Sequence, residues 1–326
     1  MATRRRKRRG RMGRTLVVLA FTVAALVAVY KCVVRPPEKD EPVGPVSSET
    51  VQTGTETQPV DLSTVRKDNY FTILVYGVDD GNGGSDTNIL VGFDAATGQA
   101  NCVSIPRDTA MYINGKSHKF NYAYNDGGQT LLCSSLSDML GIPVDYYVEV
   151  NLKGFVELVD AIGGVDFDIP INMNYDDPYQ DLEIHFKKGL QHLTGEEAIK
   201  VVRFRHNNDG SGYGTEDLGR IGTQQAFLKT VAQQMLQPSN LSKVSTYAKI
   251  FNQYVKTDLN LGNLAWFGQE VIQMGTGNIN FYTLPGEWSG AKGRYMLDTA
   301  AAVEMVNRCL NPYQQPRALS DMNLVT

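Results

Sequence analysis

A mostly apolar run of twenty residues near the N-terminus, positions 15–34, constrains this chain more than any other feature. At about 1.5 Å per helical residue the run spans roughly 30 Å, the thickness of the hydrocarbon core of a bilayer. Its one charged residue, Lys31, lies near enough to the end to reach the lipid headgroups. We therefore predict one transmembrane helix over residues 15–34.

The flanks of this run set its orientation. Eight Lys and Arg residues lie within the first 14 positions, and positive flanks stay in the cytoplasm, so residues 1–14 are a predicted cytoplasmic tail. A cleaved signal peptide is the alternative. It is disfavoured because no small-residue cleavage pattern follows the run, and because Tyr30 and Lys31 make Cys32 a poor lipoprotein cysteine. The predicted location is the cell membrane, with a single pass and an extracytoplasmic domain.

Composition divides the exported part in two. Residues 35–66 hold five of the 13 Pro, many Ser, Thr and Glu, and no aromatic residue. Such a segment cannot bury a core, and it is predicted to be a disordered extracytoplasmic stalk. Residues 67–326 are long enough for one large domain, which is the predicted catalytic domain.

The net charge of −4 conceals an acidic exported part. Without the eight basic residues of the tail, 23 Lys and Arg oppose 35 Asp and Glu, a balance of −12. A nucleic-acid-binding domain normally has a basic face, so nucleic acid is an unsuitable partner. Four His without an HExxH motif, and no Cys-x-x-Cys pair, also argue against a zinc enzyme.

Runs rich in β-branched and aromatic residues alternate with helical patterns along the exported domain. Strands are predicted at residues 70–78, 88–93, 101–105, 146–150, 165–169, 278–284 and 293–296. Helices are predicted at residues 152–162, from a capping box at 194–197 onward, and at 217–237, 242–255, 263–274 and 298–310. This alternation indicates an α/β domain with a layered sheet.

Two aspartates lie beside the first two predicted strands. Asp79 follows the strand at 70–78, and Asp86 precedes the strand at 88–93. A short turn between paired strands would bring both to one edge of the sheet. Mg²⁺ prefers oxygen ligands and keeps several waters, so the pair is a candidate magnesium site. A plain turn is the alternative, because Asp, Asn and Gly also favour turns.

Arginines form the second candidate set. Arg107 follows a predicted strand, Arg203 and Arg205 are two positions apart, and Arg220 lies in the first turn of a predicted helix. The planar fork of arginine binds phosphate oxygens in pairs, so several arginines beside Mg²⁺ would suit a pyrophosphate. Taken singly, each is more commonly a surface ion-pair partner.

The spacing of Arg203 and Arg205 carries a structural prediction. Residues two apart share a face only in an extended segment, where Phe204 would pack on the other side. The helix opened by Thr194 is therefore predicted to end by about Val202. The Gly-rich residues 209–214 lack the Lys of a phosphate loop and are predicted to be a flexible insertion.

Several ordered blocks carry a family resemblance. The blocks are GVD at 77–79, SDTNIL at 85–90, SIPRDT at 104–109, KFNYAY at 119–124, the stretch 141–170, KGLQHLTGEEA at 188–198, RFR at 203–205 and DLGRIGTQQ at 217–225. In this order they resemble the LytR–CpsA–Psr (LCP) family of cell-wall glycopolymer ligases. The resemblance covers about residues 70–235, with a looser likeness through the C-terminal strands.

The resemblance implies a layered α-β-α domain with a central mixed sheet and a glycopolymer phosphotransferase activity. Such an enzyme takes a glycopolymer, such as a teichoic acid or a capsule, from a polyprenyl-pyrophosphate carrier. It transfers the polymer to a peptidoglycan sugar hydroxyl through a phosphodiester. By position, Asp79 and Asp86 would hold Mg²⁺ and, with Arg107, form the catalytic set. The implied substrate-binding residues are Arg107, Arg203, Arg205, Arg220 and Gln224.

Two positions depart from the family pattern. Many members carry an arginine just before the SD motif, where this chain has Gly83 and Gly84, and another before the QQ pair, where it has Thr223. The grip on the pyrophosphate or the donor preference is expected to differ accordingly. Cys102 and Cys133 lie in the matched region and could form a disulfide or serve as small buried hydrophobic residues.

Two other functions remain open from the sequence. A polyprenyl-pyrophosphate hydrolase would use the same site with water as the acceptor. A non-enzymatic envelope sensor or transcriptional attenuator is the third reading. It is disfavoured because the basic tail is too short for a helix-turn-helix, and because a binding module has no need of paired carboxylates beside four arginines.

Overall fold

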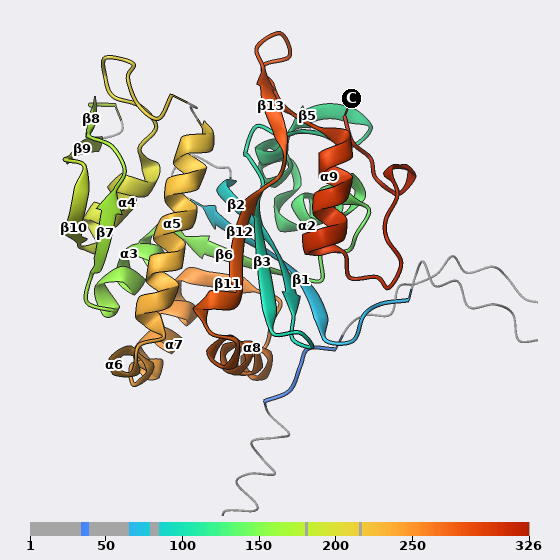
Figure 1. Ribbon diagram of the computed structural model, residues 1–326, viewed down its shortest axis with the longest axis horizontal. Coiled ribbons are helices and arrows are strands. Elements are labelled where there is room, and N and C mark those ends of the chain that lie inside the picture. Colours follow the sequence, from blue (N-terminus) through green and yellow to red (C-terminus); the bar gives the residue numbers. More distant parts are fainter. Residues whose placement is uncertain (1–33, 39–64, 79–84, 180–181, 215–216, 326) are drawn as a thin grey trace, which may run out of the picture.

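The sheet at the centre of the protein is mixed and six-stranded, in the order β11-β6-β1-β2-β3-β12 (Figure 1). This computed structural model describes residues 34–38, 65–78, 85–179, 182–214 and 217–325. β1 pairs in parallel with β6 and antiparallel with β2, and β12 pairs in parallel with β3. The expected α/β domain with a central mixed sheet is confirmed. The strands are β1 (Tyr70–Val78), β2 (Ser85–Asp94), β3 (Gln99–Ser104), β6 (Tyr146–Asn151), β11 (Val255–Thr257) and β12 (Ile279–Thr283).

Helices pack on both faces of the sheet. On one face α2 (Phe120–Leu140), α9 (Thr299–Met305) and the π-helical turn Val306–Leu310 cover a core that contains Leu74 and Tyr76 of β1. On the other face α8 (Leu261–Met274) packs on Phe71 and Ile73 of the same strand. Because β1 is buried on both faces, it reads as a nearly continuous apolar run, which is why its bounds were predictable.

A third core lies beside the sheet. It is enclosed by α3 (Leu152–Ala161), α4 (Gly195–Arg203) and α5 (Asp217–Met235) with two hairpin-like pairs. These pairs are β7 (Val165–Ile169) with β10 (Gly189–Leu193), and β8 (Met173–Asp177) with β9 (Leu182–Phe186). The remaining elements are β4 (Ala110–Ile113), β5 (Lys116–Lys119), α6 (Pro238–Leu241), α7 (Val244–Tyr254), β13 (Gly286–Ser289), β14 (Arg294–Leu297) and short 3-10 turns at Thr276–Asn278 and Leu319–Asp321.

Local chemistry explains where α3 and α4 begin. The Asn151 side chain accepts a hydrogen bond from the backbone of Lys153 at the start of α3. Thr194 and Glu197 form the predicted capping box at the start of α4. α3 is followed by Gly164, whose φ is +79° and whose added Cβ would lie 2.4 Å from His192 Nε2. No other residue fits there without a shift of the neighbouring strand.

Some bounds differ from the sequence-based expectation. β2 begins at Ser85, before the predicted residue 88, because it pairs with β1 as far as Val78. α2 is interrupted at Gly127 and Gly128, whose backbone angles are not helical. Pro238 does not merely stop α5; it is the first residue of α6, a position where its missing N–H costs nothing.

The three cysteines within the described residues, Cys102, Cys133 and Cys309, are free thiols. Of the two readings left open for Cys102 and Cys133, the structure therefore supports separate packed side chains. The predicted transmembrane span at 15–34 lies outside the described residues except for its last position. Among the helices that are described, none has both the length and the apolar character needed to cross a bilayer.

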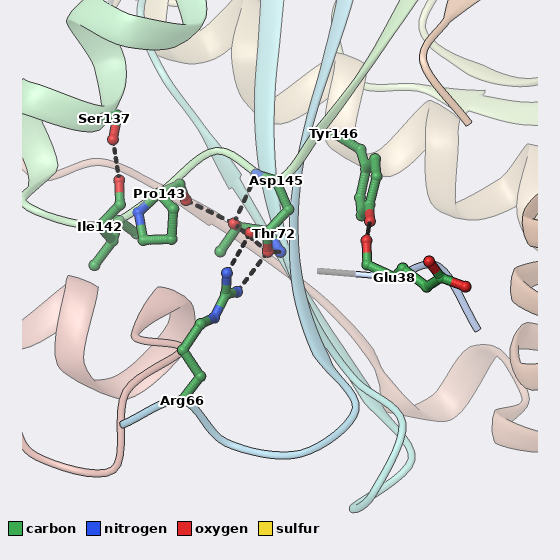
Figure 2. A network of polar contacts seen from close by, with 8 residues as sticks. All are labelled: Glu38, Arg66, Thr72, Ser137, Ile142, Pro143, Asp145 and Tyr146. Carbon is green, nitrogen blue, oxygen red and sulfur yellow. Dashed lines mark hydrogen bonds and ion pairs between the residues drawn. The ribbon is translucent and has the colours of Figure 1, made fainter. Parts of the chain in front are cut away.

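An ion pair between Arg66 and Asp145 fixes the chain just before the first strand of the sheet, β1. Arg66 binds Asp145 in a two-pronged arrangement, with Nη1–Oδ1 at 2.5 Å and Nη2–Oδ2 at 2.6 Å (Figure 2). The same carboxylate accepts hydrogen bonds from the backbone N–H of Thr72 (2.8 Å) and from its hydroxyl (2.9 Å). The end of the predicted stalk is thus fixed to both β1 and the residue before β6.

Candidate active site

The candidate carboxylates map to the edge of the sheet where β1 ends and β2 begins. Gly77 pairs with Thr87, and Val78 pairs with Ser85, so Asp86 is the additional residue of a β-bulge. Bulges commonly redirect a side chain next to an active site. Asp79 lies outside the described residues, and only the backbone of Asp86 is described. The register therefore fits the expected juxtaposition of the two positions, and their side-chain geometry stays a prediction.

Arg107 lies in a tightly held turn at the same edge. The backbone of Ile105 donates to Asn88 O (2.8 Å), which brings the chain leaving β3 beside the start of β2. Thr109 closes the turn through its N–H and its hydroxyl, which donate to Pro106 O at 3.0 and 2.7 Å. The Arg107 carbonyl accepts a bond from the backbone of Asn121 at the start of α2 (3.0 Å).

Asp108 is the charged centre of this turn. Its Oδ1 lies 3.0 Å from Lys119 Nζ and 3.9 Å from Arg107 Nε. Its carbonyl accepts a bond from the backbone of Tyr295 in β14 (3.0 Å). The turn is thus tied to α2 and to the β13–β14 hairpin, so its side chains are held in place before any ligand binds.

The arginine pair lies where α4 ends. Arg203 is the last helical residue, Phe204 is buried (1% exposed), and Arg205 is exposed. The predicted burial of Phe204 is confirmed, whereas Arg203 is still helical and not part of an extended segment. The helix ends one residue after the predicted Val202, because the backbone of Phe204 still donates to Lys200 O and Val201 O.

The Gly-rich residues 209–214, predicted to be a flexible insertion, follow a segment that is bound to β8. Two asparagines fix it to β8. Asn207 Oδ1 accepts from the backbone of Asn174 (2.6 Å), and Asn208 binds the backbone of Asp176 through both its Oδ1 (2.7 Å) and its Nδ2 (2.9 Å). Side chains that replace backbone partners in this way impose an ordered loop on a Gly-rich sequence.

Tyr213 joins this loop to α5. Its ring packs edge-on against Phe204 at 5.7 Å between centroids, and its hydroxyl accepts a bond from Thr223 Oγ1 (2.9 Å). Burial raises the pKa of Tyr213, and the nearby charge of Arg220 partly opposes this shift. Arg220 is buried (3% exposed). At the position where many family members carry arginine, Thr223 thus binds the hydroxyl of Tyr213 and holds this aromatic side chain against α5.

The two glutamines of α5 bind the backbone of neighbouring elements. Gln224 Nε2 donates to Val202 O (3.0 Å) at the end of α4. Gln225 Nε2 lies within 3.1 Å of Ser104 Oγ, Tyr282 O and Thr283 Oγ1, at the ends of β3 and β12. These bonds bring the end of α4, the start of α5 and the end of β3 together.

A cleft of about 840 Å³ opens where these segments meet. Arg205 and the loop that follows it form one wall, and Trp288 and Tyr295 of the β13–β14 hairpin form the other. Pro106 and Asp108, on either side of Arg107, also line it, as does Leu218 of α5. Of the predicted substrate-binding residues, Arg205 lines the cleft directly, whereas Arg107, Arg203, Arg220 and Gln224 belong to the segments that build it.

Aromatic residues of this cleft, among them Trp288 and Tyr213, were not identified as site residues from the sequence. Trp288 is half exposed (50%) and its ring lies 5.6 Å from Lys119 Nζ. Tyr213 sits in the loop dismissed as an insertion. A single half-exposed Trp does not change the hydrophobic periodicity of its segment. The residues that position the two rings are distant in the sequence or separated from them by a loop. The one available signal was that Trp occurs only twice in the chain.

Comparison with known proteins assigns the chain to a family. The model of the LytR_cpsA_psr family matches residues 44–310. The chain belongs to this family. The family of glycopolymer ligases that the ordered blocks resemble is thereby confirmed.

Relatives of this LytR_cpsA_psr protein include two named polyisoprenyl-teichoic acid–peptidoglycan teichoic acid transferases. TagU of Bacillus cereus is 36% identical over 200 residues, which are 60% of this chain and 62% of TagU. TagV of Bacillus subtilis is 31% identical over 259 residues, which are 75% of this chain and 64% of TagV. The matched region is therefore less than two thirds of the length of either relative.

Solved structures share the fold. The crystal structure of B. subtilis TagV aligns with a TM-score of 0.61 and 27% identity, over 73% of this chain and 94% of TagV. Protein gbs0355 of Streptococcus agalactiae aligns with a TM-score of 0.64 and 25% identity, over 74% of this chain and 86% of that protein.

The metal site expected for this LytR_cpsA_psr member is not described. Among the residues that the structure does describe, no three His, Cys, Asp or Glu side chains cluster as metal ligands. The expected ligands are Asp79 and Asp86, whose side chains are not among them. The bulge at Asp86 is the one local feature that fits a ligand position.

Proposed function

We propose that this protein is a membrane-anchored glycopolymer transferase that faces the cell wall. The observation that carries the proposal is the cleft lined by Arg205, Asp108 and Trp288. The turn that contains Asp108 is bound to β2 through the hydrogen bond from Ile105 N to Asn88 O. The relatives TagU and TagV are named as transferases of teichoic acid from a polyisoprenyl carrier to peptidoglycan. The proposed anchor is the span at residues 15–34, with the N-terminus in the cytoplasm.

The proposed donor is a glycopolymer on a polyprenyl pyrophosphate. Arg205 binds the phosphate oxygens from the wall of the cleft, and Arg107, Arg203 and Arg220 add positive charge from the segments behind it. Asp79 and Asp86 would hold Mg²⁺, which neutralises phosphate charge when bound. Arginine is suited to this role because its fork binds two oxygens at once.

The proposed reaction is a phosphoryl transfer. A sugar hydroxyl of peptidoglycan attacks the phosphorus that carries the glycopolymer, a new P–O bond forms, and the P–O bond to the polyprenyl phosphate breaks. The hydroxyl proton passes to a carboxylate of the site, and polyprenyl monophosphate leaves. In such reactions the protein contributes positioning and charge stabilisation rather than covalent chemistry.

The wall of the cleft that contains Trp288 is the proposed binding site of the acceptor. Trp288 presents a flat apolar face beside Asp108, which can accept hydrogen bonds from hydroxyl groups. A sugar ring has one flat face of C–H groups and a rim of hydroxyls, so it matches both. This arrangement favours a sugar acceptor over water, and therefore transfer over the hydrolase alternative.

Incubation with labelled lipid-pyrophosphate glycan, Mg²⁺ and uncrosslinked peptidoglycan tests the proposal. Label is expected on the glycan strands with the wild type. Asp79→Ala and Arg205→Ala should each lower the rate by about 10²-fold or more, since each removes charge stabilisation from the transition state. Arg308→Ala is the matched control, because Arg308 is an exposed arginine paired with Glu304 on the surface.

Other outcomes of this assay discriminate between the functions. Release of free phosphorylated glycan without labelled strands would identify a hydrolase. No turnover by any variant, together with equal donor binding by the wild type and Arg205→Ala, would contradict both enzymes and favour a sensor.

A further inference from the structure

The four residues that directly follow the predicted membrane span, 35–38, are bound to the folded domain at both ends. Asn263 Nδ2 of α8 donates to Arg35 O (3.3 Å), and the Tyr146 hydroxyl of β6 donates to Glu38 O (2.5 Å; Figure 2). Pro37, between them, is buried. The predicted stalk therefore does not begin as a free spacer, and the domain is held within a few residues of residue 34.

The chain returns to the same place after residue 64. Arg35 and Glu38 line a cavity of about 520 Å³ that Arg66 and Asp145 also line. Glu38 and Arg66, on either side of the segment that is not described, therefore lie at one face of the domain. The length of that segment cannot set the distance between the domain and the predicted span, because the residues before it are already fixed.

The outer side of α8 beside this cavity has an apolar stripe, next to which Gln269 and Gln273 are exposed. Leu261, Ala265, Gly268 and Ile272 are all exposed, with Leu261 at 69% and Ile272 at 52%. Spacings of four, seven and eleven residues place the four in one stripe along a helix. The single charged residue of α8, Glu270, lies nine positions after Leu261 and thus on the opposite side. The inner side of α8 packs on the sheet through residues such as Phe267 and Met274.

Basic side chains border the stripe. Arg35 and Lys256 line a shallow depression together with Leu261, and their side chains are 60% and 76% exposed. Each of these cations has an acidic partner: Arg35 pairs with Glu38, Lys256 with Glu149, and the nearby Arg66 with Asp145. Asp258 accepts a bond from the backbone of Tyr147. Exposed apolar side chains flanked by Arg and Lys, whose long apolar stems can lie along a membrane interface, are typical of surfaces that rest on a bilayer.

We propose that α8 and the residues bound to it, 35–38, form a membrane-contact face that rests on the outer surface of the bilayer. This inference rests on the proposed membrane anchor. The candidate cleft lies at the other end of the sheet, where β1 ends; Figure 1 shows α8 and the β13 hairpin at opposite ends of the molecule. A nine-residue strand is about 30 Å long, so β1 separates the two ends by about that distance.

Tryptophan quenching in vesicles tests the contact. The full chain, with Trp266→Phe and Trp288→Phe, is reconstituted into phosphatidylglycerol vesicles whose acyl chains are brominated near the headgroup. Leu261→Trp and Ile272→Trp report from the stripe. Leu190→Trp is the matched control, because Leu190 is equally exposed (74%) on β10. The stripe reporters are expected to be quenched at least two-fold more strongly than the control.

A second measurement avoids dependence on the packing of Trp266. With Trp288→Phe as the one substitution, so that Trp266 is the sole indole, ten Gly and Ser residues are inserted either after residue 50 or between residues 34 and 35. Quenching of native Trp266, which lies in α8, is expected to survive the first insertion and to fall with the second. Equal quenching of the stripe and control reporters would overturn the proposal, as would loss of Trp266 quenching with the first insertion.

Vesicle flotation separates failure of the contact from failure of the anchor. Protein that floats with the vesicles but shows equal quenching at residues 190 and 261 is anchored without the proposed contact. Protein that does not float has no anchor, which overturns both the anchor and the contact.

Discussion

Trp288 belongs to none of the three hydrophobic cores of the described residues, so its ring is available to a ligand. In a Trp266→Phe background it is the sole indole, since the chain has two Trp. Binding of uncrosslinked glycan strands is expected to shift its emission. Trp288→Ala should raise the acceptor KM about five-fold, corresponding to about 1 kcal/mol of lost stacking, and leave the donor KM unchanged.

Trp288→Phe is the control, because it keeps an aromatic face and should retain most of the acceptor affinity. If Trp288→Ala instead raised the donor KM and left the acceptor KM unchanged, Trp288 would bind the donor and not the acceptor.

Glu149 is a buried carboxylate (5% exposed) shared by four elements. It accepts hydrogen bonds from Tyr76 (3.0 Å), Tyr124 (3.1 Å) and Lys256 Nζ (2.8 Å). Glu149→Ala leaves two phenols without an acceptor, so we expect a loss of about 2–3 kcal/mol in the free energy of unfolding, measured by urea denaturation. Glu149→Gln keeps one acceptor oxygen and should lose less. Equal stability of Glu149→Ala and the wild type would contradict this role.

Single residues show how far the candidate site was predictable. The spacing of Arg203 and Arg205 correctly predicted the burial of Phe204, because that argument needs only the geometry of the local chain. That Arg205 faces Trp288 was not predictable, because this depends on a hairpin about eighty positions later. The order of the loop after Arg205 also escaped prediction, because Asn207 and Asn208 bind β8 and not their own segment.

The first turns of α5 contain a matched pair of glycines. A Cβ on Gly219 would lie 2.2 Å from Tyr213 Cβ, whereas a Cβ on Gly222 would have no neighbour within 4 Å. Gly222→Ala should therefore stabilise the protein by about 1 kcal/mol through helix propensity. Gly219→Ala should destabilise it by about 1–2 kcal/mol and raise the donor KM, because Tyr213 and its loop must move away from α5.

Thermal unfolding and donor kinetics of the two variants provide the measurement. The prediction is the opposite sign of the two stability changes. A gain in stability with both variants would show that Tyr213 does not pack against α5 in solution.

Helices and strands differed in how visible they were in the sequence. α4 was predictable from its capping box, and β1 from a continuous apolar run. α2 and the β4–β5 and β8–β9 pairs were not assigned. α2 contains a non-helical break at Gly127 and Gly128 that interrupts its period. The short strands of the β4–β5 and β8–β9 pairs depend on contacts with each other and with neighbouring elements, because their own residues have no strong strand propensity.

The molecule as a whole should lose stability at alkaline pH. Burial raises the pKa of Cys102 from 9.0 to about 12, and that of Tyr295 from 10.0 to about 12. Between these values the unfolded chain has released protons that the folded protein still holds. The stability that each group contributes is complete below its unfolded pKa and is lost as pH rises toward its folded pKa. Each group lowers the free energy of unfolding by about 1.4 kcal/mol per pH unit.

Urea denaturation at pH 8 and at pH 10.5 measures this effect. Cys102→Val should reduce the loss, because it removes a titrating thiol and keeps an apolar side chain. Stability that is unchanged over this range would show that the buried thiol and phenols are not protected from solvent.

The arrangement of the layers could be assigned only as a class from the sequence. Alternating strands and helices correctly indicated an α/β domain. The sheet order depends on parallel pairing of β1 with β6 and of β3 with β12, and these partners are far apart along the chain. No local signal specifies such contacts. The third core, around α3, α4 and α5, is invisible for the same reason.

The junction at Arg66 also has a mechanical consequence. Once the bonds to Arg35 and Glu38 are broken, a pull on the chain from its N-terminal side reaches the sheet through Arg66. It then acts along β1, which is paired on one side with β2 and on the other with β6. Ladder hydrogen bonds lie across the strands, so tension along β1 loads both ladders in shear, many bonds at once, instead of peeling them apart singly. If the domain is tethered at one end and bound to a rigid polymer at the other, β1 would therefore be the last strand to separate from the sheet under tension.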